Sequence, residues 1–290
     1  MSEVRRGMWA LTWRRFRRSK LAVLALVYVG FVGVLAIAAP IIAGSKSTPI
    51  PFGPNDVDVA TRLHAPDAQH RFGTDDLGRD VLARMIHGAR VSLTVGLLAT
   101  MMALVVGCFL GAMAGYYGGA ADWLVSRLIE VVLCFPLLFL ALAIVAFFGA
   151  SIWTIMIALG LTTWTSEARY VRGEFLRIRE MEFAYAARAS GARDSRIILR
   201  HLLPNALAPV LVSASFGVAY AILTESALSF LGLGVPLPTA TWGSILASGR
   251  QFIESAWWLA LFPGVAIFLT VAAFNIIGDR FRDALDPRSE

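Results

Sequence analysis

Charged residues are scarce in this chain. They make up 16% of its 290 residues, whereas apolar side chains make up 57%, and the mean hydropathy is +0.67. A soluble domain typically has about 25% charged residues. The composition therefore excludes an ordinary water-soluble globule and predicts a protein that lies in a bilayer.

Cysteine and the usual catalytic motifs are nearly absent as well. Cys108 and Cys134 lie in apolar runs without CxxC or Cys/His spacing, so we expect buried packing residues and no disulfide framework or zinc site. The four histidines are scattered, and the chain has no HExxH, GxSxG or GxxxxGKS/T motif. The sequence predicts no catalytic residue, metal or cofactor, and any nucleotide energy must come from another polypeptide.

Lysine is rare too, since Lys20 and Lys46 are the only two. The net charge of +6 therefore comes from arginine, and the arginines cluster beside apolar runs. No long basic face is interleaved with aromatic residues. This pattern favours contact with anionic membrane lipid and excludes nucleic acid as a partner.

Long apolar runs predict an all-α integral membrane protein with six transmembrane helices. An apolar run must reach about 20 residues to cross the bilayer, and the first run is too long for a signal peptide. Residues 123–166 must hold two helices with a turn at 149–151. The expected spans are residues 21–43, 91–116, two within 123–166, 205–231 and 256–277.

The arginine distribution sets the expected orientation. Basic residues precede the first span, fill the segment between the fourth and fifth spans, and follow the sixth. By the positive-inside rule both termini are cytoplasmic. We divide the chain into a basic N-terminus, first helix and external loop (1–88), a five-helix core with a cytoplasmic loop at 167–204 (89–279), and a cytoplasmic tail (280–290).

Three glycines and three charged residues stand out within the spans. Gly107, Gly111 and Gly115 recur every fourth residue, which predicts close helix packing on one face. Arg127 and Glu130 lie one helical turn apart, where they favour a structural ion pair over a place in a pathway.

Glu225 is the only acidic residue in the fifth span, near its outer end. A charge in a span is costly and marks a functional position. Two interpretations stay open: Glu225 lines the outer mouth of a polar path, or it contacts a neighbouring subunit.

The polar break between the fourth and fifth spans is rich in small helix formers ahead of Gly191, and Pro204 follows. This pattern predicts two short helices with a turn at Gly191 and a stop at Pro204. Such a hairpin could fit a groove on another protein, or it could lie on lipid headgroups.

Residues 185–204 resemble the coupling motif of bacterial ABC importer permeases. Tyr185 stands where that motif has Glu, and His201 where it has Ile, so the likeness depends on spacing and small side chains. The resemblance assigns ATPase coupling to Tyr185, Ala186, Ala187, Gly191, Leu203 and Pro204.

Four other segments, 70–80, 228–234, 242–244 and 283–287, resemble the C-type permease subunit of dipeptide and oligopeptide importers. The resemblance implies a type I ABC importer permease fold in the bacterial inner membrane, forming half of a path for di- or oligopeptides. It implies three kinds of partner: a homologous second permease, two ATPase subunits that hold ATP and Mg²⁺, and an external solute-binding protein.

Other functions stay open at this point. The cargo could be a nickel chelate or glutathione, or the chain could be a membrane assembly subunit that transports nothing. A self-sufficient transporter or channel is a further alternative. Transport by this chain without an ATPase would favour that last one.

The external loop carries a cluster of charges. We expect Asp75, Asp76, Arg79 and Asp80 to help form a docking surface for the solute-binding protein. A simpler interpretation is that Thr74 and the two acids after it begin a helix, as a hydroxyl cap beside the positive end of its dipole.

Overall fold

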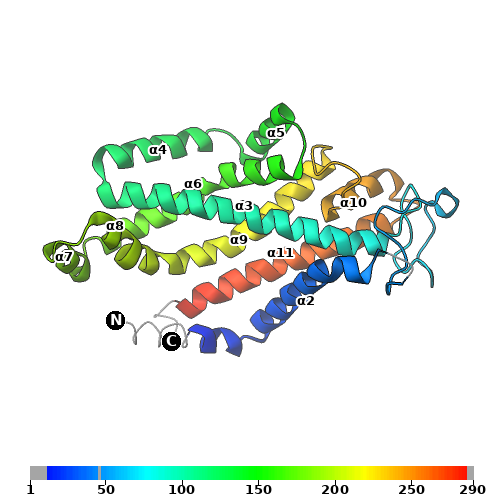
Figure 1. Ribbon diagram of the computed structural model, residues 1–290, viewed down its shortest axis with the longest axis horizontal. Coiled ribbons are helices and arrows are strands. Elements are labelled where there is room, and N and C mark those ends of the chain that lie inside the picture. The colour runs from blue at the N-terminus through cyan, green and yellow to red at the C-terminus, as the bar shows by residue number, and fades with distance from the viewer. Residues whose placement is uncertain (1–11, 45–46, 286–290) are drawn as a thin grey trace.

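The computed structural model describes residues 12–44 and 47–285, and its regular structure is helical. Within these ranges, extended backbone pairs only at two isolated bridges, so the predicted all-α class is confirmed. The long helices lie side by side (Figure 1). They are α2 (Lys20–Ile42), α3 (Val81–Tyr117), α6 (Ile152–Ile178), α9 (Leu203–Phe230) and α11 (Trp258–Leu285).

Shorter elements lie beside and at the ends of these long helices. The pair α4 and α5 lies along α3 and α6, and the two ends of the molecule differ in what covers them (Figure 1). One end carries α7 and α8; the other carries α10 and residues 47–80, which we call the cap segment. The short helices are α4 (Gly119–Leu133), α5 (Leu137–Phe148), α7 (Glu182–Ala189), α8 (Asp194–Arg196) and α10 (Trp242–Gly249), with 3-10 turns at Val59–Thr61 and Arg250–Phe252.

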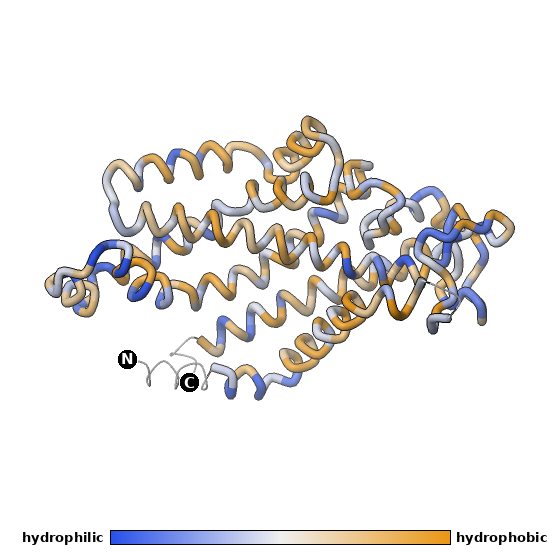
Figure 2. The backbone as a smooth tube through the Cα atoms, in the orientation of Figure 1, coloured by the Kyte–Doolittle hydropathy of each residue, from blue (hydrophilic) through white to orange (hydrophobic). Residues whose placement is uncertain are grey.

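The long helices consist mostly of hydrophobic residues, and hydrophilic residues gather toward the two ends of the molecule (Figure 2). On α2, Leu24 and Ile37 are 65% and 81% exposed. A helix that is apolar on its exposed face is suited to lipid or to another membrane chain.

Length and composition identify four spanning helices among the described residues: α2, α3, α11 and the Pro209–Phe230 part of α9. The bent pair α4 and α5 would make a fifth. The 27-residue α6 is not among them, and its second half carries five charged residues. The count by these criteria is therefore four or five, against the six expected.

The third expected span is not one straight helix. Helices α4 and α5 meet at an angle of 84°, and Pro136 lies at the start of α5. Proline has no N–H to continue the helix and clashes with the preceding turn. Cys134 lies at this bend and is exposed, which corrects its predicted burial, whereas Cys108 is half-buried.

Two predicted boundaries fall inside helices. Helix α3 begins at Val81, so the loop before it ends at residue 80, and the division at residue 88 falls within α3. The boundary after residue 279 falls inside α11. Both helices run past their apolar stretches, and for this reason hydropathy misplaces their ends. The first residues of α2 and the last of α11 lie at the same end of the molecule as α7 (Figure 1).

Candidate functional site

The polar break forms a bent helical segment at residues 179–202, which we call the hairpin segment. Helix α6 continues through residues 167–178, so the segment starts later than the loop at 167–204 predicted from charge. Helix α7 leads to a turn, and from Asp194 the chain is helical without interruption through α8, a π-helical stretch at Ile197–Leu202, and α9.

Gly191 terminates α7 with a Schellman motif. Its φ is +73°, a left-handed conformation that glycine adopts without strain. The Gly191 N–H donates to the Arg188 carbonyl at 2.9 Å, and the Ala192 N–H donates to the Ala187 carbonyl at 3.2 Å. These two bonds are the defining pair of this helix end, so the predicted turn at Gly191 is confirmed.

Pro204 does not stop a helix, which corrects the prediction. It is the second residue of α9, inside a helix that already runs from Asp194, and proline and π-bulges are places where a helix bends without ending. The wider π-helical stretch immediately precedes it. Residues 194–230 therefore form one continuous helical rod, and the hairpin segment leads directly into α9.

Apolar anchors fix the hairpin segment to the long helices. Ala184, Ile197 and Leu202 are fully buried and join a cluster that includes Phe175 of α6 and Tyr116 of α3. Burial of a large aliphatic side chain contributes about 1.5–3 kcal/mol. The segment is thereby packed against α3, α6 and the start of α9.

Polar contacts reinforce this attachment at the end of α3. The Tyr116 hydroxyl donates to Asp194 at 2.7 Å. The Arg179 guanidinium donates to the Gly115 carbonyl at 3.0 Å, and Arg188 lies over the Tyr116 ring at 5.4 Å. Residues on both sides of the Gly191 turn therefore contact α3.

The opposite face of α7 is exposed and, apart from Glu182 and Tyr185, consists of small residues. Ala186, Ala189, Ser190 and Gly191 are all exposed there. A slim surface of this kind lets another protein approach the backbone closely. Leu203 and Pro204, the remaining motif positions, are partly buried at the start of α9, away from this surface.

Tyr185 is half-exposed and belongs to a polar cluster. Its hydroxyl donates to Glu180, and Arg188 lies 5.7 Å from its ring centre. Hydrogen bonds from Tyr185 and then Arg179 hold the pKa of the Glu180 carboxyl below its usual value. A carboxylate therefore lies beside the motif position where the resembling family has Glu, although it comes from residue 180.

Gly107, Gly111 and Gly115 all face α6. A methyl group added to Gly111 would lie 2.5 Å from the Ala168 carbonyl oxygen, and one on Gly115 would lie 2.5 Å from Cβ of Phe175. Such distances leave no room for a side chain, so glycine allows α3 and α6 to approach each other at these positions.

Glu167 is a buried carboxylate that hydropathy did not identify. It is 5% exposed within α6, accepts a hydrogen bond from the Ser213 hydroxyl of α9, and lies against Gly107 of α3. Buried acids need such partners. The signal in the sequence is the helical spacing of the apolar residues at 164, 168, 171 and 175, which predicts that the helix continues past Glu167.

The charges predicted to form an external docking surface are mostly inside the cap segment. Asp75, Arg79 and Asp80 are only 1%, 5% and 3% exposed, and Arg79 pairs with Asp75 at 2.7 Å. Arg84 of α3 approaches the same carboxylate at 3.4 Å. These three predicted residues hold the cap together, and only Asp76, about a third exposed, reaches the surface.

Thr74 does not begin a helix. Asp80 is the N-cap of α3: its carboxylate accepts from the Ala83 N–H at 2.8 Å and from Nδ1 of His70 at 2.9 Å. The Thr74 hydroxyl donates instead to the Thr61 carbonyl. The helix start lies further along the chain because the residues after Thr74 form a tight turn around Asp75.

Glu225 is fully buried in this structure. The Ser229 hydroxyl donates to one carboxylate oxygen at 2.8 Å, and the other has no hydrogen-bond partner among the described residues. Gly234 and Gly243 pack closely on Ser229. The loop before α10 and the start of α10 thus lie over Ser229, the partner of Glu225, and a place for Glu225 in a polar path or at a neighbouring subunit stays a prediction.

Arg127 and Glu130 pair on the exposed side of α4, with side chains 59% and 56% exposed. Exposed pairs of this kind contribute little to stability. The pair lies away from the hairpin segment and the cap segment, so the structure brings it together with no other predicted site residue.

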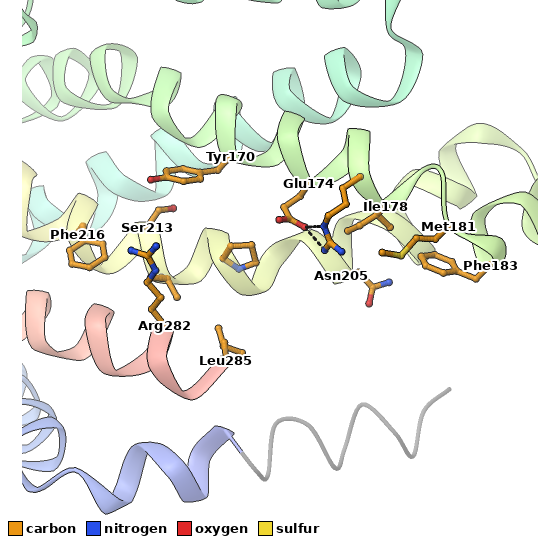
Figure 3. Close-up of a pocket in the computed structure, with 13 residues that line it drawn as sticks. Tyr170, Glu174, Ile178, Met181, Phe183, Asn205, Ser213, Phe216, Arg282 and Leu285 are labelled. Carbon is orange, nitrogen blue, oxygen red and sulfur yellow. Dashed lines mark hydrogen bonds and ion pairs between the residues drawn. The ribbon is translucent and has the colours of Figure 1, made fainter. Parts of the chain in front are cut away.

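A cavity of about 750 Å³ lies between the start of α7 and the adjacent ends of α6, α9 and α11 (Figure 3). We call it the hairpin cavity. Arg282 reaches from α11 toward α9, and Glu174 pairs with Arg177 at 2.7 Å. The lining residues are Tyr170, Glu174, Arg177, Ile178, Met181, Phe183, Asn205, Pro209, Val212, Ser213, Phe216, Arg282 and Leu285.

Curated relatives match almost the whole chain. A dipeptide transport system permease protein of Alkalihalophilus pseudofirmus is 44% identical over 97% of this chain and 90% of its own length. An oligopeptide transport system permease protein of Escherichia coli is 41% identical over 98% of this chain and 92% of its own length.

The fold is shared with a solved transporter. The MetNI methionine ABC transporter in an inward facing conformation matches with a TM-score of 0.57 and 19% identity, over 71% of this chain and 98% of that chain. At this identity the likeness shows the fold alone.

Two family models match the sequence. Residues 7–66 match the N-terminal TM domain of oligopeptide transport permease C. Residues 107–290 match the binding-protein-dependent transport system inner membrane component. With the hairpin segment, the cap segment and the helical fold in place, this chain belongs to the family of inner-membrane permease components of binding-protein-dependent ABC transport systems.

Proposed function

We propose that this chain forms half of the translocation path of an ATP-driven importer for di- or oligopeptides. The names of relatives above 40% identity support the peptide cargo. In this proposal ATP and Mg²⁺ bind to two partner ATPase subunits, a homologous second permease completes the path, and an external solute-binding protein delivers the peptide.

The continuous rod from Asp194 to Phe230 is the observation that carries the proposed mechanism. The exposed small face of α7 docks on an ATPase subunit, and closure of the ATPases on ATP displaces the hairpin segment. Because the buried anchors tie this segment to α3 and α6, its displacement tilts the cytoplasmic ends of three helices together.

Six membrane crossings fit this function best. The bent pair α4 and α5 would count as one crossing, and α6 as another whose polar half extends into the cytoplasm beside the hairpin segment. The first residues of α2 and the last of α11 lie at the same end of the molecule as the hairpin segment (Figure 1), which supports cytoplasmic termini. The cap segment and α10 then face the outside, where the exposed surface around Asp76 is available to a binding protein.

Uptake by reconstituted vesicles tests the proposal. The complete complex should accumulate a labelled dipeptide only when ATP is inside and the binding protein is outside. Unlabelled peptides should compete with it, whereas nickel chelates and glutathione should not. Accumulation of a nickel chelate in place of peptide would assign a different cargo, and ATP-independent uptake would overturn the coupling to an ATPase.

A further inference from the structure

The hairpin cavity has the size of a small-molecule site and is bordered by the hairpin segment and by the end of α11. Its volume of about 750 Å³ falls within the usual range for ligand pockets, roughly 300–1,000 Å³. Its wall is lined by Met181 and Phe183 of the hairpin segment and by Leu285 at the end of α11. A molecule inside would touch both elements at once.

The cavity presents one uncommitted positive charge. Glu174 and Arg177 satisfy each other across 2.7 Å, and the Ser213 hydroxyl is committed to Glu167. Arg282 is exposed and, among the described residues, no carboxylate lies within ion-pair distance of its guanidinium. The site therefore favours a ligand with one anionic end.

The rest of the wall is apolar and aromatic. Phe216 lies beside Arg282, and Ile178, Met181 and Phe183 line the other end of the cavity (Figure 3). The Tyr170 hydroxyl adds a hydrogen-bonding group on the same wall. An anionic end combined with apolar side chains and a polar backbone is the chemistry of the C-terminal part of a short peptide.

We infer that the hairpin cavity binds a short peptide, with the peptide α-carboxylate on the Arg282 guanidinium. This inference rests on the proposed peptide cargo. A peptide that bridges α11 and the start of α7 stabilises the present arrangement of the hairpin segment, because a ligand favours the state that binds it. Peptide that has accumulated in the cytoplasm therefore slows further import through this site.

Direct binding tests the inference. The complete transporter in nanodiscs, without binding protein, is titrated with an N-terminally labelled tripeptide, and fluorescence anisotropy gives the Kd. Loss of a charge-assisted bond predicts a Kd at least about tenfold higher for the C-terminal amide or for Arg282→Gln. Arg280→Gln is the matched control, since Arg280 is exposed on α11 and pairs with Asp283 at 3.1 Å; it should bind as the wild type does.

Vesicles preloaded with peptide provide the second readout. Preloading should slow uptake by the wild type and by Arg280→Gln, and should slow Arg282→Gln much less. Equal Kd values for acid and amide, or equal slowing in all three proteins, would overturn the inference. A phospholipid that copurifies with the wild type and is lost from Arg282→Gln, without peptide binding, would also overturn it. Failure of the wild type to import external peptide would instead reject the proposed function.

Discussion

Individual buried polar residues link the helices of this permease. Glu167 joins α6 to α9 through Ser213, Asp75 joins the cap segment to α3 through Arg84, and Tyr116 joins α3 to the hairpin segment through Asp194. The first and third bonds connect elements far apart in the sequence, whereas the cap segment directly precedes α3. Their partners come from tertiary structure, so the sequence alone suggested docking for Asp75 and nothing for Glu167.

Glu167 gives a residue-scale prediction. Removal of its carboxylate in Glu167→Ala breaks the link between α6 and α9 and leaves the Ser213 hydroxyl only the Val210 carbonyl of its own helix as a partner, at a cost of about 1–3 kcal/mol. The thermal midpoint of the purified complex should fall by several degrees. Glu167→Gln keeps the shape and an acceptor oxygen, so its midpoint should stay closer to the wild type. Equal midpoints for all three proteins would show that the Ser213 contact contributes nothing.

The positions of the lipid-facing helices could be predicted from the sequence, whereas helix bends and some helix ends could not. Long apolar runs identify α2, α9 and α11 because a helix that faces lipid needs little more than length and hydropathy. The bend between α4 and α5 depends on α5 packing against α6 through Ala141 and Val145, which Pro136 permits but does not specify. The start of α3 and the end of α6 lie beyond their apolar runs. Hydropathy therefore placed the start of α3 too late in the sequence and the end of α6 too early.

The contact between α3 and α6 gives an element-scale prediction. In Gly111→Ala the new methyl group meets the Ala168 carbonyl oxygen at 2.5 Å, and overpacking of this kind costs about 1–3 kcal/mol. The complex should melt at a lower temperature. Gly173→Ala on α6 is the control, because a methyl group there meets nothing within 4 Å. If Gly111→Ala and Gly173→Ala had the same melting temperature, the close approach of α3 and α6 would not be a packing constraint.

At the scale of the whole molecule, the hairpin segment and the cap segment lie at opposite ends of one helical body (Figure 1). The coupling motif was recognisable in the sequence because it depends on local spacing and on a glycine turn. Its attachment to three helices was not, since Ala184, Ile197 and Leu202 have no sequence signal that distinguishes them from lipid-facing residues. The hairpin cavity likewise brings together residues 170–216 and 282–285.

The ratio of peptide imported to ATP hydrolysed tests the central claim, that the hairpin segment transmits force into α9. Gly191→Val forces a β-branched residue into a left-handed turn, a strain of about 1–2 kcal/mol, which corresponds to a factor of about 5 to 30 in an equilibrium. An added side chain meets nothing else in the chain within 4 Å, so the complex should still assemble.

Gly191→Asn is the matched control, because asparagine tolerates this conformation. We predict that, in vesicles of equal complex content, Gly191→Val imports less peptide for each ATP hydrolysed, whereas Gly191→Asn remains close to the wild type. The same ratio in all three proteins would contradict a coupling role for the hairpin segment.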